Sequence, residues 1–287
     1  MHGKQVLITG ATRGIGLAAA EALAARGANV AIVGRNATAL HVAAARVKSA
    51  GPNGGAVDAM IADLSSQAAV RKLATEVLGR YPRLDVLINN AGAMYAKRHL
   101  TEDGIELTWA VNHLAPFLLT ALLRERLQAS APARIVTTAS AAHQGARIHF
   151  ADLNAERSYR GFERYGQTKL ANILFTRELA RRLEGTGITA TCFHPGLVAT
   201  GFNRNNGLIM DLGMTILRPV SRSPQKGAET LVWLATLPQS ALADGGYYFD
   251  KQQVMPSPEA QDMDTARWLW AVSEAQCASP GRGAETP

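Results

Sequence analysis

Short apolar runs rich in β-branched residues alternate with longer segments of helical periodicity along most of the chain. Each run is apolar on both faces and ends at Gly, Asn or Pro, which is typical of parallel strands covered by helices. The predicted strands are QVLITG (5–10), NVAIVGR (29–35), VDAMIADL (57–64), LDVLINNAG (84–92), ARIVTTAS (133–140) and ITATCFHPG (188–196), with GGYYFD (245–250) as a last edge strand. The predicted helices cover 16–27, 37–51, 66–80, 101–128, 162–184 and 258–276.

This alternation predicts an α/β protein with a single-domain Rossmann fold. We expect a doubly wound parallel sheet of about seven strands in the order 3-2-1-4-5-6-7, with helices on both faces. No linker divides the chain, so one domain is expected over residues 1–276. Residues 197–223 mix Gly and Asn with exposed-looking apolar residues, which predicts a lid over a site. Residues 277–287 are expected to form a disordered tail.

Composition favours a folded protein of a reducing compartment. Hydrophobic residues make up 47% and charged residues 18% of the chain, enough for a buried core. Cys192 and Cys277 lie too far apart in sequence to suggest a disulfide framework or a zinc site. The first strand-like run begins at Lys4, and the longest apolar stretch is interrupted by Asn112, His113 and Pro116. We therefore expect a cytoplasmic protein without a membrane anchor.

The net charge of +7 comes mainly from scattered arginines on predicted helix faces. No basic run or interleaved aromatic platform accompanies them, so a nucleic-acid partner is not expected. A mild excess of positive charge also suits an enzyme whose cofactor carries phosphates.

A glycine-rich segment, TGATRGIG (9–16), follows the first predicted strand and opens the first helix. Gly10, Gly14 and Gly16 allow a tight turn in which backbone N–H groups and the helix N-terminus approach a pyrophosphate. Its position in a strand–loop–helix unit predicts a dinucleotide site.

The end of the second strand bears on the choice of cofactor. A carboxylate that would accept from an NAD ribose is missing there, and Gly34, Arg35 and Asn36 stand instead. Arg35 can pair with a 2′-phosphate, and Arg13 in the glycine loop can point at the same group. NADP(H) is therefore predicted over NAD(H), although Arg35 could also be a solvated strand end.

The stretch YGQTKLANIL (165–174) places Tyr165 and Lys169 one helical turn apart, on the same helix face. A nearby positive charge favours tyrosinate, so Lys169 is expected to lower the pKa of Tyr165. Tyr247 and Lys251 have the same spacing in a predicted strand, where they would stand roughly 13 Å apart and could not couple. Ser140 ends the fifth strand, at the edge where such sheets bind ligands.

Together these motifs resemble the short-chain dehydrogenase/reductase family over about residues 4–250. The matching segments are TGATRGIG, NNAG (89–92), HPGLVAT (194–200) and the ordered set Asn112, Ser140, Tyr165 and Lys169, which fall at the family's catalytic tetrad. VNHLAPFLLT and QTKLANILFT are similar to the retinol dehydrogenase-like branch, which acts on lipophilic carbonyls and alcohols.

The resemblance implies a role for each of these residues. Tyr165 would be the general acid/base, Ser140 would bind the substrate carbonyl, and Lys169 would also hold the nicotinamide ribose. Asn112 would hold a water that links Lys169 to solvent, or else be a satisfied buried amide. The expected cofactor contacts are Gly10, Thr12, Arg13, Gly14, Ile15, Gly16, Arg35, Asn36, Asp63, Leu64, Asn90, Ala91, Gly92, Tyr165, Lys169, Pro195, Gly196, Val198 and Thr200, with no metal.

We therefore expect an NADP(H)-dependent oxidoreductase, a ketone/aldehyde reductase or alcohol dehydrogenase, for a lipophilic small molecule. Tailoring of a secondary metabolite is one role for such an enzyme, and family members are often homodimers or homotetramers built on helices 101–128 and 162–184. The alternatives are a non-catalytic NADP-binding sensor, which has no need of an acid/base, and a nucleotide-sugar epimerase, whose chains are usually longer.

His113, His143, His149 and His194 lack metal-site spacing and are expected to be structural or substrate-lining.

Overall fold

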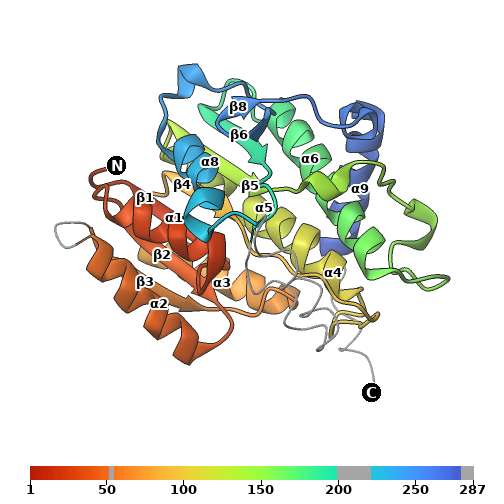
Figure 1. Cartoon of the computed structure of the whole chain (residues 1–287), viewed down its shortest axis with the longest axis horizontal. Coiled ribbons are helices and arrows are strands. Elements are labelled where there is room, and N and C mark those ends of the chain that lie inside the picture. The colour runs from red at the N-terminus through yellow and green to blue at the C-terminus, as the bar shows by residue number, and fades with distance from the viewer. Residues whose placement is uncertain (52–54, 199–220, 279–287) are drawn as a thin grey trace.

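The computed structural model describes residues 1–51, 55–198 and 221–278, and these residues contain one eight-stranded sheet (Figure 1). The strand order is β3-β2-β1-β4-β5-β6-β7-β8, and all neighbours pair in parallel except β7 and β8. This confirms the predicted fold class and the order of the first seven strands. The strands are β1 Gln5–Thr9, β2 Asn29–Gly34, β3 Val57–Ile61, β4 Val86–Asn89, β5 Ala133–Thr138, β6 Ile188–Phe193, β7 Tyr247–Phe249 and β8 Gln252–Gln253.

Helices cover both faces of the sheet. One face carries α1, α2 and α8, and the other carries α3, α5 and α6, with α9 packed on α6. None of the helices in the described ranges is long and apolar enough to cross a membrane. The helices are α1 Gly14–Ala24, α2 Ala37–Ala50, α3 Gln67–Arg80, α4 Leu107–Trp109, α5 Ala115–Ala129, α6 Gly161–Arg182, α8 Pro224–Thr236 and α9 Met263–Ala278.

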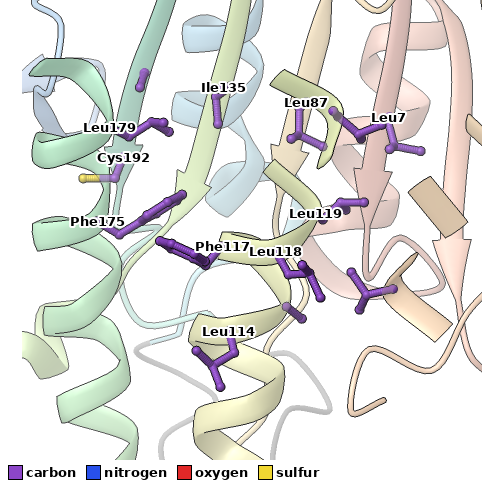
Figure 2. Close-up of a cluster of buried hydrophobic side chains, with 14 of the residues drawn as sticks. Leu7, Leu87, Leu114, Phe117, Leu118, Leu119, Ile135, Phe175, Leu179 and Cys192 are labelled. Carbon is purple, nitrogen blue, oxygen red and sulfur yellow. The ribbon is translucent and has the colours of Figure 1, made fainter. Parts of the chain in front are cut away.

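Side chains alternate between the two faces of the sheet along each strand, so a separate hydrophobic core forms on each face. Val6 and Ile8 of β1 pack with the α1, α2 and α8 side, whereas Leu7 packs with the α3, α5 and α6 side. Figure 2 shows the second cluster, in which Phe117 of α5 and Phe175 of α6 lie together against the sheet, with ring centres 5.7 Å apart. Full burial of a large apolar side chain typically stabilises a fold by about 1.5–3 kcal/mol.

The predicted helix over 101–128 is divided in the structure. α4 passes into a π-helical turn, Ala110–Leu114, before α5 begins, and Pro116 lies in the first turn of α5. Proline lacks the N–H that a continuous helix would need there, which favours a change in winding just before it. The π-helical turn contains Asn112, and such turns are frequent at functional sites.

Helix α9 covers part of the helix pair on which we expected a dimer. The Trp270 ring packs on Phe117 and Phe175, with ring centres 4.9 and 5.9 Å away, and the guanidinium of Arg182 lies 4.3 Å from the Trp270 ring centre. The expected oligomer stays a prediction.

Two expectations concern segments that the structure covers only in part. α9 continues through Cys277 and Ala278, which we had placed in the tail, and 279–287 lie outside the described residues. Of the predicted lid, only residues 197–198 and 221–223 are described.

Candidate active site

The glycine loop after β1 is joined to the loop after β4 by hydrogen bonds. Thr9 Oγ1 accepts from the backbone N–H groups of Asn90 and Ala91 at 3.0 and 3.1 Å. The Asn90 amide donates to the carbonyl oxygens of Thr9 and Gly10 at 3.0 and 3.2 Å. Two predicted cofactor segments, TGATRGIG and NNAG, therefore form one surface at the carboxyl edge of the sheet.

Glycine is required at two points of that surface. Gly10 has φ +67°, and a Cβ there would lie 2.7 Å from the Cα of Ala91. A Cβ at Gly16 would lie 2.5 Å from the Asn90 side-chain nitrogen. The residue before α1, Arg13, is extended and makes no side-chain cap. The first N–H groups of α1 are thus left for an anion, as a pyrophosphate site needs.

The two arginines of this region are both available to a ligand. Arg13 and Arg35 are exposed, and neither side chain forms a hydrogen bond or ion pair with another described residue. Asn36 caps α2, since its Oδ1 accepts from the Ala39 N–H at 2.8 Å, and its expected cofactor contact stays a prediction. Thr12 packs over the end of β2, where its methyl carbon lies 2.4 Å from the position a Cβ would take at Gly34.

The remaining expected cofactor positions lie at the ends of β3, β4 and β6. Asp63 is exposed and accepts from the N–H and hydroxyl of Ser65 at 2.9 and 2.8 Å. Gly196 has φ +78° and packs on Arg222, whose N–H donates to the Leu197 carbonyl oxygen at 2.7 Å. Ile15 and Val198 both approach Gly227 of α8, and Leu64 packs against the core. Gly92 and Pro195 lie in the loops after β4 and β6. Thr200 lies outside the described residues.

Ser140, Tyr165 and Lys169 come together at the carboxyl end of β5. The side chains of Ser140 and Tyr165 are hydrogen-bonded to each other, and Ser140 Oγ accepts from the Ala142 N–H at 3.2 Å. The ammonium nitrogen of Lys169 lies 5.5 Å from the centre of the Tyr165 ring and donates to the Thr138 carbonyl oxygen at 2.9 Å. The spacing that predicted one shared helix face is therefore realised on α6.

Burial shifts both ionisable groups of this set. Desolvation raises the pKa of Tyr165 to about 12, although its hydrogen bond to Ser140 acts in the other direction. Desolvation lowers the pKa of Lys169 to about 8. The pKa of Tyr165 is therefore raised in this structure and not lowered as expected, because removal of the phenolate from water outweighs the hydrogen bond to Ser140. At neutral pH, Tyr165 holds a proton that it can donate.

Asn112 is a satisfied buried amide. Its Oδ1 accepts from the Ala93 N–H at 2.8 Å, and its Nδ2 donates to the Ala93 carbonyl oxygen at 2.9 Å and to Thr168 Oγ1 at 3.0 Å. These bonds fasten the loop after β4 to α6, one residue before Lys169. Of the two expectations for Asn112, the structure shows the satisfied buried amide, and the water that would link Lys169 to solvent stays a prediction.

The second Tyr-x-x-x-Lys pair is separated in the fold. β7 ends at Phe249, and Lys251 lies in the turn to β8 with φ +62°, so the prediction that both residues lie in one strand is wrong. The Lys251 ammonium pairs with Glu229 at 2.8 Å, whereas Tyr247 is buried in the sheet. The prediction missed the turn because β8 is only two polar residues long and carries no hydrophobic pattern.

Two features of the site were not found from the sequence. Arg164, next to Tyr165, is buried in an ion pair with Glu106 at 2.7 Å, and its guanidinium lies 4.8 Å from the Trp109 ring centre. Glu106 also accepts from the N–H groups of Thr108 and Trp109 at 2.8 and 3.0 Å. The other feature is the contact between His143, which was expected to be structural or substrate-lining, and the Ser140 carbonyl oxygen at 2.7 Å. Only tertiary packing distinguishes these residues from solvated charges.

Comparison with known proteins identifies the family. The model of the short chain dehydrogenase family matches residues 4–208. The chain belongs to the short-chain dehydrogenase family. Within this family it is 43% identical to mouse (Mus musculus) retinol dehydrogenase 14, with 96% of this chain and 86% of the relative covered. It is also 43% identical to a Streptomyces sp. protein provisionally named daunorubicin C-13 ketoreductase, with 98% and 95% covered.

A solved structure of the short-chain dehydrogenase family gives the same architecture. A short chain dehydrogenase from Burkholderia cenocepacia, in complex with NADP, is 29% identical and has a TM-score of 0.69. The match covers 86% of this chain and 95% of that one. The retinol dehydrogenase-like resemblance is thus confirmed, and the chain is an oxidoreductase of a family that uses NAD(P).

Proposed function

We propose that the protein is an NADP(H)-dependent reductase or dehydrogenase that acts on a lipophilic carbonyl compound or alcohol. The observation that carries the chemistry is the meeting of Ser140, Tyr165 and Lys169 at the carboxyl edge of the sheet. Ligands of doubly wound sheets bind at this edge. Beside the three residues lies the glycine cradle, the turn with Gly10, Gly14 and Gly16 at the start of α1. The first N–H groups of α1 have no side-chain cap there, which fits the pyrophosphate of a dinucleotide.

The three side chains can share the work of carbonyl reduction. NADPH, when bound, supplies the hydride. The hydroxyls of Ser140 and Tyr165 donate hydrogen bonds to the substrate oxygen, where negative charge develops. Tyr165 then gives its proton to that oxygen, since its raised pKa keeps the phenol protonated until then. The charge of Lys169 stabilises the tyrosinate that remains, and alcohol oxidation runs through the same groups in reverse.

The preference for NADP(H) rests on Arg13 and Arg35. Both are exposed beside the glycine cradle, and among the described residues neither has a charged partner to compete with a phosphate. Gly34 and Arg35 also leave no carboxylate at the end of β2 that would repel a 2′-phosphate. A guanidinium can bind that phosphate through two parallel hydrogen bonds.

The substrate class rests on the relatives. Retinol and daunorubicin, named in two of them, are large and mostly apolar molecules with a reducible or oxidisable oxygen. We propose a substrate of that kind, in a cytoplasmic setting, with tailoring of a secondary metabolite as one role.

The test is turnover of a panel of apolar ketones, aldehydes and alcohols by wild type and by Tyr165→Phe. We expect kcat to fall by about a hundredfold or more in the variant, because the acid/base is lost, while NADPH should still bind through the glycine cradle. Tyr247→Phe is the matched control, since it alters the other Tyr-x-x-x-Lys pair, and it should retain wild-type kcat. Equal, very slow turnover of wild type and Tyr165→Phe, with tight NADPH binding, would favour the non-catalytic sensor.

A further inference from the structure

A buried histidine, His143, connects the last described segment of the chain, residues 254–278, to the catalytic centre. His143 follows Ser140 by three residues and is 1% exposed. Its Nδ1 lies 2.7 Å from the carbonyl oxygen of Ser140, and its Nε2 lies 3.1 Å from the backbone nitrogen of Ser257. One imidazole ring therefore joins the catalytic serine to the chain segment before α9.

The two contacts fix the tautomer of His143. A backbone N–H can only donate, so Nε2 accepts from Ser257 and carries no proton. A carbonyl oxygen can only accept, so Nδ1 carries the proton and donates it to Ser140. A protonated imidazole would point a second N–H at the Ser257 N–H. The bridge is thus complete only with neutral His143, in agreement with the lowering of its pKa by burial.

The hydrogen bonds to the Ser140 carbonyl oxygen fix the backbone of the loop that carries the catalytic hydroxyl. This carbonyl oxygen also accepts from the His143 N–H at 3.2 Å, and the Ser140 hydroxyl is fixed from the other side by the Ala142 N–H at 3.2 Å. Because the Ala142 N–H uses one lone pair of the Ser140 hydroxyl, its O–H and its second lone pair remain for a substrate oxygen and Tyr165.

A second histidine ties the same segment to the opposite side of the site. His113 is fully buried, and its Nε2 lies 2.8 Å from the Ser273 hydroxyl of α9. That hydroxyl donates to the Leu269 carbonyl oxygen at 2.7 Å, so the His113 ring donates to Ser273. His113 is the neighbour of Asn112, which fastens the loop after β4 to Thr168.

We propose that His143 is a positioning residue for Ser140, and that residues 254–278 thereby set the geometry of the catalytic centre. The proposal rests on the proposed function for its kinetic consequences. It needs no contact between His143 and the substrate, because the histidine acts through the Ser140 backbone.

Three variants separate the two bonds. His143→Asn keeps a donor near the Nδ1 position, whereas His143→Gln keeps an acceptor near the Nε2 position. Ser257→Pro removes the N–H from which Nε2 accepts, together with the Ser257 hydroxyl, and the φ of −59° at Ser257 already suits proline. Ser257→Ala, which removes the hydroxyl and keeps the N–H, is its control and should keep wild-type kcat. We expect kcat to fall by about tenfold in all three variants, because each interrupts the chain of hydrogen bonds from Ser257 through His143 to the Ser140 carbonyl oxygen. The KM for NADPH should not change, since the glycine cradle lies elsewhere.

The matched control is Val47→Ala. Val47 is a fully buried core residue of α2, so its truncation lowers stability without touching the site. It should keep wild-type kcat at 25 °C despite a lower urea midpoint. Wild-type kcat in both His143→Gln and Ser257→Pro would overturn the proposal.

A measurement independent of turnover keeps the proposal distinct from the proposed function. ¹⁵N NMR of the imidazole nitrogens should show His143 as the neutral Nδ1–H tautomer at pH 7. The amide hydrogen of Ala142 should also exchange faster in Ser257→Pro than in wild type. An Nε2–H or charged ring, or unchanged exchange, would refute the bridge. Absence of turnover on every substrate, with these two results as expected, would count against the proposed function alone.

Discussion

The ammonium nitrogen of Lys169 lies 5.5 Å from the centre of the Tyr165 ring, one turn away on α6. Burial acts on the two groups in opposite directions, raising the pKa of Tyr165 to about 12 and lowering that of Lys169 to about 8. Near neutral pH the pair is therefore a protonated phenol beside a mostly charged amine, which is the state that a proton donor to an alkoxide requires.

The rate of carbonyl reduction should depend on the charge of Lys169. As the pH rises through about 8, Lys169 loses its proton and no longer stabilises the tyrosinate left after proton transfer. We expect kcat to be level between pH 6 and 7 and to fall above pH 8, measured with saturating cofactor and ketone. Lys251→Met, which removes the lysine of the other pair, should leave this profile unchanged. A level profile up to pH 10 would contradict the assignment.

Lys169 should also lower stability over a defined pH range. Its folded pKa of about 8 is below the ordinary value of 10.5, so between these values the unfolded chain binds a proton that the folded chain does not. Stability is then lost as the pH falls from about 10.5 to about 8, by at most about 1.4 kcal/mol per pH unit. Urea unfolding should show Lys169→Met to be more stable than wild type at pH 7, with the difference vanishing near pH 10.5. A constant difference would show that packing, not titration, causes it.

Removal of Arg35 should weaken NADPH more than NADH. A charge-assisted hydrogen bond to a phosphate contributes about 1.5–3 kcal/mol, so Arg35→Ala should raise the Kd for NADPH by about tenfold or more. The Kd for NADH should change little, since NADH lacks the 2′-phosphate. Fluorescence titration measures both constants, and Arg124→Ala on α5, away from the glycine loop, is the control. Tighter binding of NADH than NADPH by wild type would overturn the cofactor preference.

Replacing only one partner of the buried Glu106–Arg164 ion pair should strongly lower the free energy of unfolding. Arg164→Met leaves the Glu106 carboxylate buried without its partner, which should lower the free energy of unfolding by about 3–5 kcal/mol. The double variant with Glu106→Gln should recover part of that loss, because no unpaired charge remains. Arg181→Ala removes a half-exposed arginine and leaves the buried Glu178 its second partner, Arg182, so it should cost less than about 1 kcal/mol. Equal losses in both arginine variants, measured by urea unfolding, would contradict this account.

The order of the sheet could be predicted because its strands are long apolar runs between helices. Helical spacing placed Tyr165 and Lys169 on one helix face, and the end of the fifth strand placed Ser140 at the ligand edge of the sheet. The expectation that all three meet came from the family resemblance. β8 escaped prediction because two polar residues cannot show a pattern. The cap that Asn36 provides for α2 through the Ala39 N–H was not predicted, while its expected contact with the cofactor stays a prediction.

The features that were missed depend on contacts between distant parts of the chain. The pKa of Tyr165 follows from how much protein surrounds its hydroxyl, which no local pattern reveals. The bridge from His143 to Ser257 joins residues 114 positions apart. Asn112 could be singled out as an unusual residue within a helix, yet its partners Ala93 and Thr168 appear only in the fold.

The hydrogen bonds of Thr9 and Asn90 have a consequence for the speed of cofactor binding. They hold the glycine loop against the loop after β4 through protein atoms alone. A surface that is already shaped does not have to be ordered during the encounter, and preorganised partners move little on binding. NADPH association should therefore be a single, concentration-dependent step in stopped-flow experiments, accelerated at low salt by the two arginines at its edge.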